Sequence, residues 1–251
     1  MSAPIEVLVE DGPVLAVNKP PGLISQGAPV GVDSLISLVK DYLAEKYDKP
    51  GAVYLGVPHR LDRPVSGVVV FSRNSKCAAR LAEQFQQRTV KKVYWACLER
   101  PPEPAEGVLK DWLYRVPDQP RVELSREGVE GAKHAELRYR TIAKAKGRAI
   151  VEIELLTGRM HQIRIQFGSR GWPIVGDHQY GAKSDFPGAA GLDARDAPIA
   201  LHAHSLTIQH PIRYDPLTIV APIPTSWRAL GFDRSVLRKH AHDDGSEKRQ
   251  S

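Results

Sequence analysis

The segment His59-Arg60-Leu61-Asp62-Arg63 combines a carboxylate with two neighbouring guanidinium groups. Coulomb attraction to Arg60 and Arg63 favours the ionised form of Asp62, so we expect the pKa of Asp62 to be lowered. A carboxylate that stays deprotonated suits a nucleophile or an electrostatic base better than a general acid. A surface ion-pair cluster is the alternative interpretation. Because Ser66-Gly67 and an apolar run follow directly, we favour a position at the mouth of a sheet.

A second polar cluster follows the turn expected at Gly158. Arg159, His161, Gln162 and Arg164 crowd around the expected start of a helix, where unpaired N–H groups attract anions. The Arg164 side chain can form a bidentate pair with a carboxylate or a phosphate. An ordinary helix N-terminus is the alternative interpretation of this cluster.

A third segment, Lys91-Lys92-Val93-Tyr94-Trp95-Ala96, interleaves basic and aromatic side chains. This pattern is typical of a nucleic-acid contact, because lysines meet phosphates and aromatic rings stack on bases. Taken alone, however, such a pattern is more often a half-buried strand. In a strand, Tyr94 and Trp95 point to opposite faces, so only one of them can line a given cleft.

The composition favours a globular protein with a mild preference for polyanions. The chain has 251 residues, 42% of them hydrophobic and 25% charged, with a net charge of +6. Its apolar runs, such as 68–71, are far shorter than the roughly 20 residues of a membrane-spanning helix, and no secretory signal is visible, so we expect no membrane partner. Two cysteines, Cys77 and Cys97, cannot build a disulfide framework, which predicts a reducing, cytoplasmic location.

Four histidines are the candidate ligands of a metal: His59, His161, His202 and His204. His202 and His204 share one face of an expected strand, but no third and fourth ligand follow in a defined motif. A glycine-rich phosphate loop and a dinucleotide motif are also missing from the sequence. We therefore expect neither a metal nor another cofactor.

The pattern around these clusters predicts more strands than helices. Helices are expected over 33–47, with Asp33 as N-cap, after Asn74, over 160–168 and near 225–230. Strands are expected over 5–9, 14–17, 53–57, 68–72, 91–98, 107–114, 121–124, 134–142, 148–156, 199–209 and 217–221. Because these strands do not alternate with helices, we predict an α+β fold with a mainly antiparallel sheet. We also expect one domain over 1–232 and a polar, disordered tail over 233–251.

Together, these motifs make the chain resemble the RluA family of RNA pseudouridine synthases. The resemblance extends over residues 7–221, most of the chain. The motifs that carry it, in the order of the family, are Lys19-Pro20-Pro21-Gly22, His59-Arg60-Leu61-Asp62-Arg63 with Ser66-Gly67, Lys92-Val93-Tyr94-Trp95-Ala96, Thr157-Gly158-Arg159-Met160-His161-Gln162-Ile163-Arg164, Pro173-Ile174-Val175-Gly176-Asp177 with Tyr180-Gly181, and Leu201-His202-Ala203 before His210-Pro211.

The resemblance implies an isomerase that converts specific uridines of rRNA or tRNA into pseudouridine after base flipping. It implies a mixed sheet with flanking helices and a central active-site cleft, no cofactor, and RNA as partner. Asp62 would be the essential carboxylate, either attacking C1′ or acting through a glycal. Arg164 would be its ion-pair partner, and Tyr94 would stack on the target uracil.

The same resemblance implies five substrate-binding residues. Arg60 would enter the RNA stack and hold the space left by the flipped nucleotide. Leu61 and Ile163 would pack the pocket walls, and Lys19 and Arg159 would meet phosphate or RNA backbone. We expect a monomer without the N-terminal S4 domain of many relatives.

Three positions depart from the pattern of the family. Val65 and Met160 stand where threonine is usual, and Gln166 stands where histidine is common. These departures leave open an RNA-binding or ribosome-assembly protein on the same scaffold, with weak or lost catalysis. An unrelated carboxylate-dependent hydrolase is a third interpretation.

Overall fold

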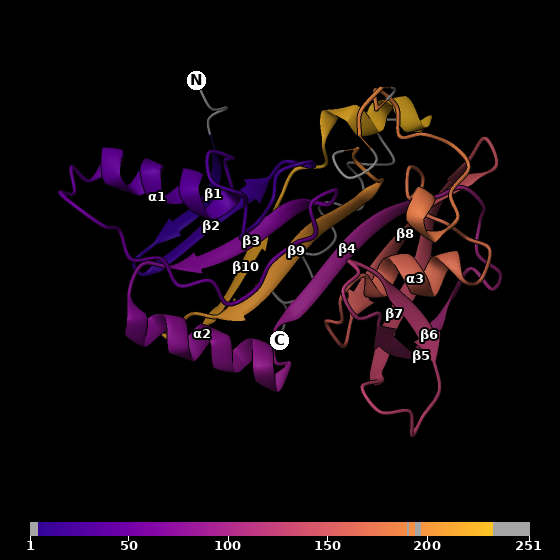
Figure 1. The fold of residues 1–251 in the computed structure, drawn as a ribbon, viewed down its shortest axis with the longest axis horizontal. Helices are drawn as coiled ribbons and strands as arrows, with labels where there is room; N and C mark the ends of the chain where they lie inside the picture. The colour runs from indigo at the N-terminus through magenta and orange to yellow at the C-terminus, as the bar shows by residue number, and fades with distance from the viewer. Residues whose placement is uncertain (1–4, 190, 194–196, 233–251) are drawn as a thin grey trace, which may run out of the picture.

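The computed structural model describes residues 5–189, 191–193 and 197–232, so the tail predicted at 233–251 lies outside the described residues. All ten strands of the described chain belong to one sheet (Figure 1). Its strands are β1 (Glu6–Asp11), β2 (Val14–Lys19), β3 (Ser66–Ser72), β4 (Lys91–Leu98), β5 (Glu106–Arg115), β6 (Val122–Ser125), β7 (Lys133–Ala145), β8 (Arg148–Leu155), β9 (Leu201–Gln209) and β10 (Pro216–Val220). The helices are α1 (Leu35–Lys46), α2 (Ser75–Gln87) and α3 (Gln162–Gly168), with short 3₁₀ helices η1 (His178–Tyr180) and η2 (Thr225–Leu230).

The sheet is mixed and mainly antiparallel, as predicted. Its strand order is β1-β2-β3-β9-β4-β8-β7-β5-β6, and β10 pairs with β9. Among the described pairs only β3 and β9 run parallel, joined at Ser66 with His202 and Gly67 with Ala203. The parallel pair therefore joins β1, β2 and β3 to the rest of the sheet.

Strand β3 is buried on both faces, which explains its continuous apolar sequence. Val68 and Val70 pack in a cluster with Leu81 of α2. Val69 and Phe71 point to the opposite face, into the larger core that contains the buried face of α1. Helices α1 and α2 thus cover the two faces of this part of the sheet (Figure 1).

The helix N-termini follow local side-chain chemistry. Asn74 caps α2 as predicted, accepting a hydrogen bond from the Cys77 N–H. Helix α1 is capped by Ser34 in a reciprocal capping box with Ser37, so the expected Asp33 cap is wrong by one position. Helix α3 starts at Gln162, because His161 before it has a φ of 51° and therefore lies in the left-handed region, outside helical geometry.

The strand predicted over 53–57 does not form. Only Gly56 pairs with Ser72, through two backbone hydrogen bonds of 2.8 and 2.9 Å. The pairing cannot continue at Pro58, which has no backbone N–H to donate. This segment therefore remains a loop that leads directly to the Asp62 motif.

Two further findings concern the cysteines and the helices. Cys77 and Cys97 are both buried and unpaired, consistent with their expected role as small apolar side chains. Within the described part of the chain, no helix is both long and apolar enough to cross a membrane.

Candidate active site

Asp62 lies in the loop that runs into the parallel pair of strands. The loop is held from one side by Ser25, whose hydroxyl donates to the Leu61 carbonyl at 2.6 Å. Gly67, the second residue of β3, has a φ of 117°, and a Cβ there would lie 2.2 Å from the Ala203 carbonyl oxygen. Only glycine permits this close approach, which fixes the end of the Asp62 loop against β9.

Lys19 also holds this loop, and its burial corrects the expectation that it meets phosphate or RNA backbone. Its side chain is completely buried, and Nζ donates to the carbonyls of Pro20 and Leu23 at 2.8 Å and of Arg63 at 3.0 Å. Burial lowers the pKa of Lys19 to about 7, while the charge of Asp62 acts in the opposite direction. Three carbonyl acceptors match the three N–H bonds of an ammonium group, so these contacts favour the charged form against the effect of burial.

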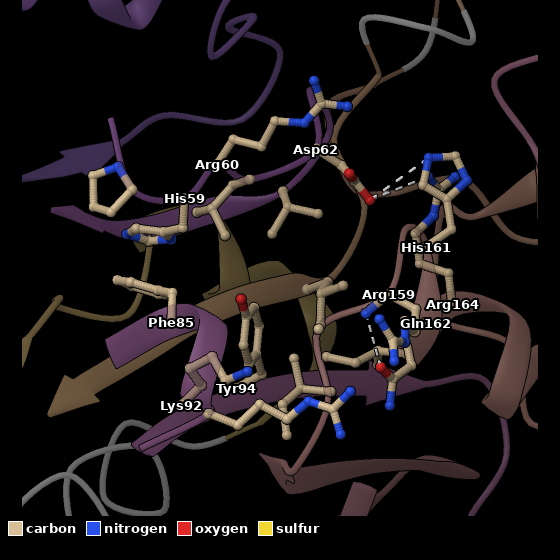
Figure 2. Close-up of a pocket in the computed structure, with 18 of the residues that line it drawn as sticks. His59, Arg60, Asp62, Phe85, Lys92, Tyr94, Arg159, His161, Gln162 and Arg164 are labelled. Atoms are coloured by element: carbon tan, nitrogen blue, oxygen red, sulfur yellow. Dashed lines mark hydrogen bonds and ion pairs between the residues drawn. The ribbon is translucent and has the colours of Figure 1, made fainter. Parts of the chain in front are cut away.

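The Asp62 carboxylate faces two cationic or polar side chains without a hydrogen bond to either. Its Oδ2 lies 3.8 Å from Arg164 Nη1 and 3.7 Å from His161 Nε2 (Figure 2). Its side chain keeps 25% of its exposure. The neighbouring Arg63 points elsewhere, because its Nε donates to the Gly22 carbonyl at 2.9 Å. The carboxylate is thus oriented by charge and remains open to the cleft.

Arg164 is held mainly by Asp177, a partner not identified from the sequence. Two hydrogen bonds of 2.7 and 2.8 Å join the guanidinium to this buried carboxylate, and Nη2 also donates to Gln179 at 3.0 Å. The guanidinium carbon lies 5.0 Å from the centre of the Tyr180 ring. Burial opposes the charged form, but the hydrogen bonds and charge of Asp177, with a smaller effect of Asp62, raise the pKa of Arg164.

His161 is oriented by the hydroxyl of Tyr180. The phenol oxygen accepts from the Val122 N–H at 3.1 Å and lies 2.8 Å from His161 Nδ1. Burial lowers the pKa of His161, partly offset by Asp62, so the ring is neutral at pH 7. Because the Tyr180 oxygen already accepts from the Val122 N–H, its own O–H is free to donate to Nδ1, an arrangement that puts the ring proton on Nε2, facing Asp62.

A cleft of about 520 Å³ opens between Asp62 and Tyr94. Burial raises the pKa of Tyr94, and Asp62 adds to this effect, so the phenol stays protonated at neutral pH. Trp95 is fully buried on the opposite face of β4, which confirms the predicted alternation. Seven of the eight predicted site residues line this one cleft: Arg60, Leu61, Asp62, Tyr94, Arg159, Ile163 and Arg164.

A second cleft of about 720 Å³ meets the first at Asp62, His161 and Arg164. Met160 lines this second cleft, whereas Val65 lines the first. Gln166 is fully buried and donates to Asp111 of β5 at 2.7 Å. Among the three departures from the pattern of the family, Gln166 therefore supports α3 rather than facing either cleft.

The histidines of β9 have structural contacts. His202 Nδ1 lies 2.9 Å from the Ser66 hydroxyl, and the His204 ring lies 4.5 Å from the Trp95 ring. Among the described residues, no group of three or more His, Cys, Asp or Glu side chains could hold a metal ion.

Sequence reasoning missed two residues that orient side chains of the site. Asp177 and Tyr180 belong to a quoted motif, but no role could be assigned to either from its neighbours in the chain. Their partners Arg164 and His161 are 13 and 19 residues away. A buried arginine requires a buried carboxylate, and that requirement is the signal that points to the nearest acidic residue of the following motif.

Comparisons with known proteins agree with this geometry. A family model described as RNA pseudouridylate synthase matches residues 13–169. An uncharacterized RNA pseudouridine synthase of Zymomonas mobilis is 35% identical over 227 residues, covering 90% of this chain and 97% of that protein. Ribosomal large subunit pseudouridine synthase D of Xylella fastidiosa is 35% identical over 228 residues, covering 88% of this chain and 66% of that protein.

A solved structure extends the agreement from sequence to fold. Human RNA pseudouridylate synthase domain containing 4 is similar with a TM-score of 0.71 and 26% identity, covering 90% of this chain and 92% of that chain. The family match spans more than half of the chain and includes Asp62, Tyr94 and Arg164. The resemblance inferred from the motifs is thereby confirmed, and the chain belongs to the RNA pseudouridylate synthase family, whose members are isomerases that act on RNA.

Proposed function

We propose that this enzyme isomerises specific uridines of ribosomal or transfer RNA, with Asp62 as the essential carboxylate. One observation carries the proposal: Asp62 is the single Asp or Glu among the described residues that line the Tyr94 cleft. The name of the Xylella fastidiosa relative supports large-subunit rRNA as a substrate class. We further propose that residues 1–232 form the catalytic domain and that the protein works in the cytoplasm as a monomer.

The reaction breaks the N1–C1′ bond of uridine and rejoins the base through C5. The C5 proton leaves and N1 gains a proton, so atoms and electrons balance without a redox cofactor. Asp62 can attack C1′ or remove the 2′ proton, and both routes need an ionised carboxylate that is not blocked by a tight ion pair. The 3.8 Å separation from Arg164 supports such a role.

The other cleft residues are assigned roles that match their exposure. Tyr94 stacks on the extruded uracil, and its protonated phenol can donate a hydrogen bond but cannot act as a base at neutral pH. Leu61 and Ile163 are buried at 5% and 4% exposure and form the apolar walls. Arg60 is exposed beside both clefts and enters the RNA stack in place of the flipped base.

Tritium release from RNA labelled at uridine C5 tests the assignment. The RNA comes from cells that lack this gene, so that its target uridines are unmodified, and it is fractionated into rRNA and tRNA. We expect release by the parent protein, none by Asp62→Asn, and parental release by Glu83→Gln, a matched carboxylate-to-amide change on the exposed side of α2. RNA binding without release by the folded parent would instead support the binding-only alternative, and release by Asp62→Asn would refute the role of Asp62.

A further inference from the structure

Three cationic side chains gather at the end of the cleft away from Asp62. Arg88 follows the last turn of α2, Lys92 lies on β4, and Arg159 lies in the turn before α3. All three line the Tyr94 cleft. Figure 2 shows Lys92 beside Tyr94, with Asp62 on the opposite side of the cleft. Three separate elements of the fold therefore bring positive charge to one place.

Within the described part of the chain, no carboxylate lies within ion-pair distance of these three cations. The Arg159 Nε donates to the His134 carbonyl at 2.9 Å, which satisfies a donor but does not neutralise the charge. Burial lowers the pKa of Lys92, and repulsion from Arg88 and Arg159 adds to the effect. A cluster of mutually repelling cations costs stability unless an anion joins it.

The whole cleft has the same imbalance of charge. Five Arg and Lys side chains line it, against the one carboxylate of Asp62. Arg164 is neutralised by Asp177, and Arg60 lies beside Asp62, so the excess is concentrated at the opposite end. Such an excess attracts a polyanion and makes its affinity depend on salt.

The position of Lys92 relative to Tyr94 indicates which part of a polyanion would bind. The two residues lie on the same face of β4, two positions apart, which is roughly 6.6 Å along a strand. Opposite them, a Cβ at Gly158 would lie 3.5 Å from the Lys92 Nζ and would partly cover it. The absence of a side chain at Gly158 leaves the ammonium group open to a ligand that lies next to the aromatic ring.

We propose that Arg88, Lys92 and Arg159 bind a phosphodiester group of the RNA strand next to the uridine that stacks on Tyr94. This inference rests on the proposed function. The resemblance already implies a phosphate or backbone contact for Arg159, and the structure adds Arg88 and Lys92 beside it as one anchor for the RNA backbone. A guanidinium fork can bind two phosphate oxygens, while the Lys92 ammonium adds a point charge. The site fixes the position of the strand and reads no base.

Salt-dependent binding of a decameric oligouridylate tests the site. Affinities are measured between 50 and 300 mM salt in the Asp62→Asn background, which prevents turnover. Because one phosphate contact changes the slope of log K against log salt by about 0.7 on a single strand, Arg88→Gln and Lys92→Gln should each reduce the slope by about that amount. Their combination should reduce it by about 1.4. We expect at least a threefold loss of affinity at 50 mM salt for each variant.

The control is Lys144→Gln, which removes an exposed lysine of β7 outside the cleft and should leave affinity and slope unchanged. Uridine nucleoside, which has no phosphate, should bind parent and variants equally. Arg88 is exposed, so its replacement tests the site even if Lys92→Gln fails to fold. An unchanged slope for Arg88→Gln, or an equal change for Lys144→Gln, would overturn the proposal.

Tritium release by the same variants in the Asp62 parent separates the two proposals. If the parent releases tritium and Arg88→Gln keeps the parental salt slope, the phosphate site is refuted and the isomerase assignment stands. If the parent binds RNA with the expected slopes and releases none, the proposed function fails while the anchor for the RNA backbone stands.

Discussion

Replacing Asp177 by asparagine should destabilise the protein strongly, because it leaves the buried guanidinium of Arg164 without its main counter-charge. The pair is bidentate, and the two side chains keep only 6% and 1% of their exposure. Asparagine preserves the shape of the side chain but presents an NH₂ group to one of the two guanidinium N–H donors. The change therefore removes charge and opposes two donors without creating a cavity.

The expected loss follows from the burial of this pair. Removing one partner of a buried ion pair costs about 3–5 kcal/mol, because the other charge cannot return to water. That is a large part of the roughly 5–15 kcal/mol that stabilises a domain. For a chain of this size, 3 kcal/mol lowers Tm by roughly 6–12 °C. The Asp62 carboxylate is 3.8 Å from Arg164 and reduces the loss, since it can move closer.

Urea unfolding at pH 7 measures this cost, with Glu123→Gln as the matched control. Glu123 pairs with Arg121 on the surface, where both side chains are about half exposed (52% and 51%). Exposed pairs contribute at most about 1 kcal/mol, so the control should unfold almost as the parent does. Equal losses for Asp177→Asn and Glu123→Gln would refute the reasoning, because burial would then make no difference to the pair.

Two further predictions concern histidines. Tyr180→Phe removes the hydroxyl that orients His161, a hydrogen bond worth about 1 kcal/mol, so the ring should lose its preference for one tautomer. Nitrogen NMR of the His161 ring should then show the two neutral tautomers in exchange. A single tautomer, unchanged from the parent, would contradict the prediction. Burial lowers the pKa of His202 to about 3, with a smaller effect of His204, whereas the unfolded chain titrates near 6.5. Because only the unfolded state binds this proton, His202 alone should lower stability by about 1.4 kcal/mol per pH unit below pH 6.5. Urea titrations at pH 7, 6 and 5 should show a smaller decrease for His202→Gln and a larger one for His178→Gln, since the Asp185 hydrogen bond raises the pKa of His178.

Periodicity and turn residues were sufficient to predict most of the sheet. The strand pattern at 68–72 required burial on both faces, and the structure supplies a helix for each face. The prediction of a strand over 53–57 was wrong. The apolar residues of this segment fit a buried strand, but its backbone pairing with β3 does not continue beyond Gly56. Composition predicts which residues are buried, but the backbone partner of a short segment depends on distant parts of the chain.

In the candidate site, too, the motifs predicted which residues come together but not the contacts made by residues far apart in the chain. The motifs predicted that Asp62, Tyr94 and Arg164 come together, and all three line one cleft. The motif containing Lys19 was correctly singled out, but its lysine was assigned the wrong surroundings. A lysine next to two prolines is typical of an exposed loop. Here, however, one of the three carbonyl groups that accept its N–H bonds belongs to Arg63, 44 residues away.

The position of Asp177 explains how Asp62, the proposed catalytic carboxylate, can lie close to an arginine without a hydrogen bond to it. A carboxylate bound by both arms of a guanidinium would have its lone pairs occupied and would be a poor base or nucleophile. Here Asp177 accepts the Nε and Nη2 donors at 2.7 and 2.8 Å, so only Nη1 faces Asp62, at 3.8 Å. The arginine thus supplies charge to Asp62 without a hydrogen bond that substrate would have to break. If Asp177 were lost, Arg164 would turn its free donors to Asp62, so we expect Asp177→Asn to reduce kcat as well as stability.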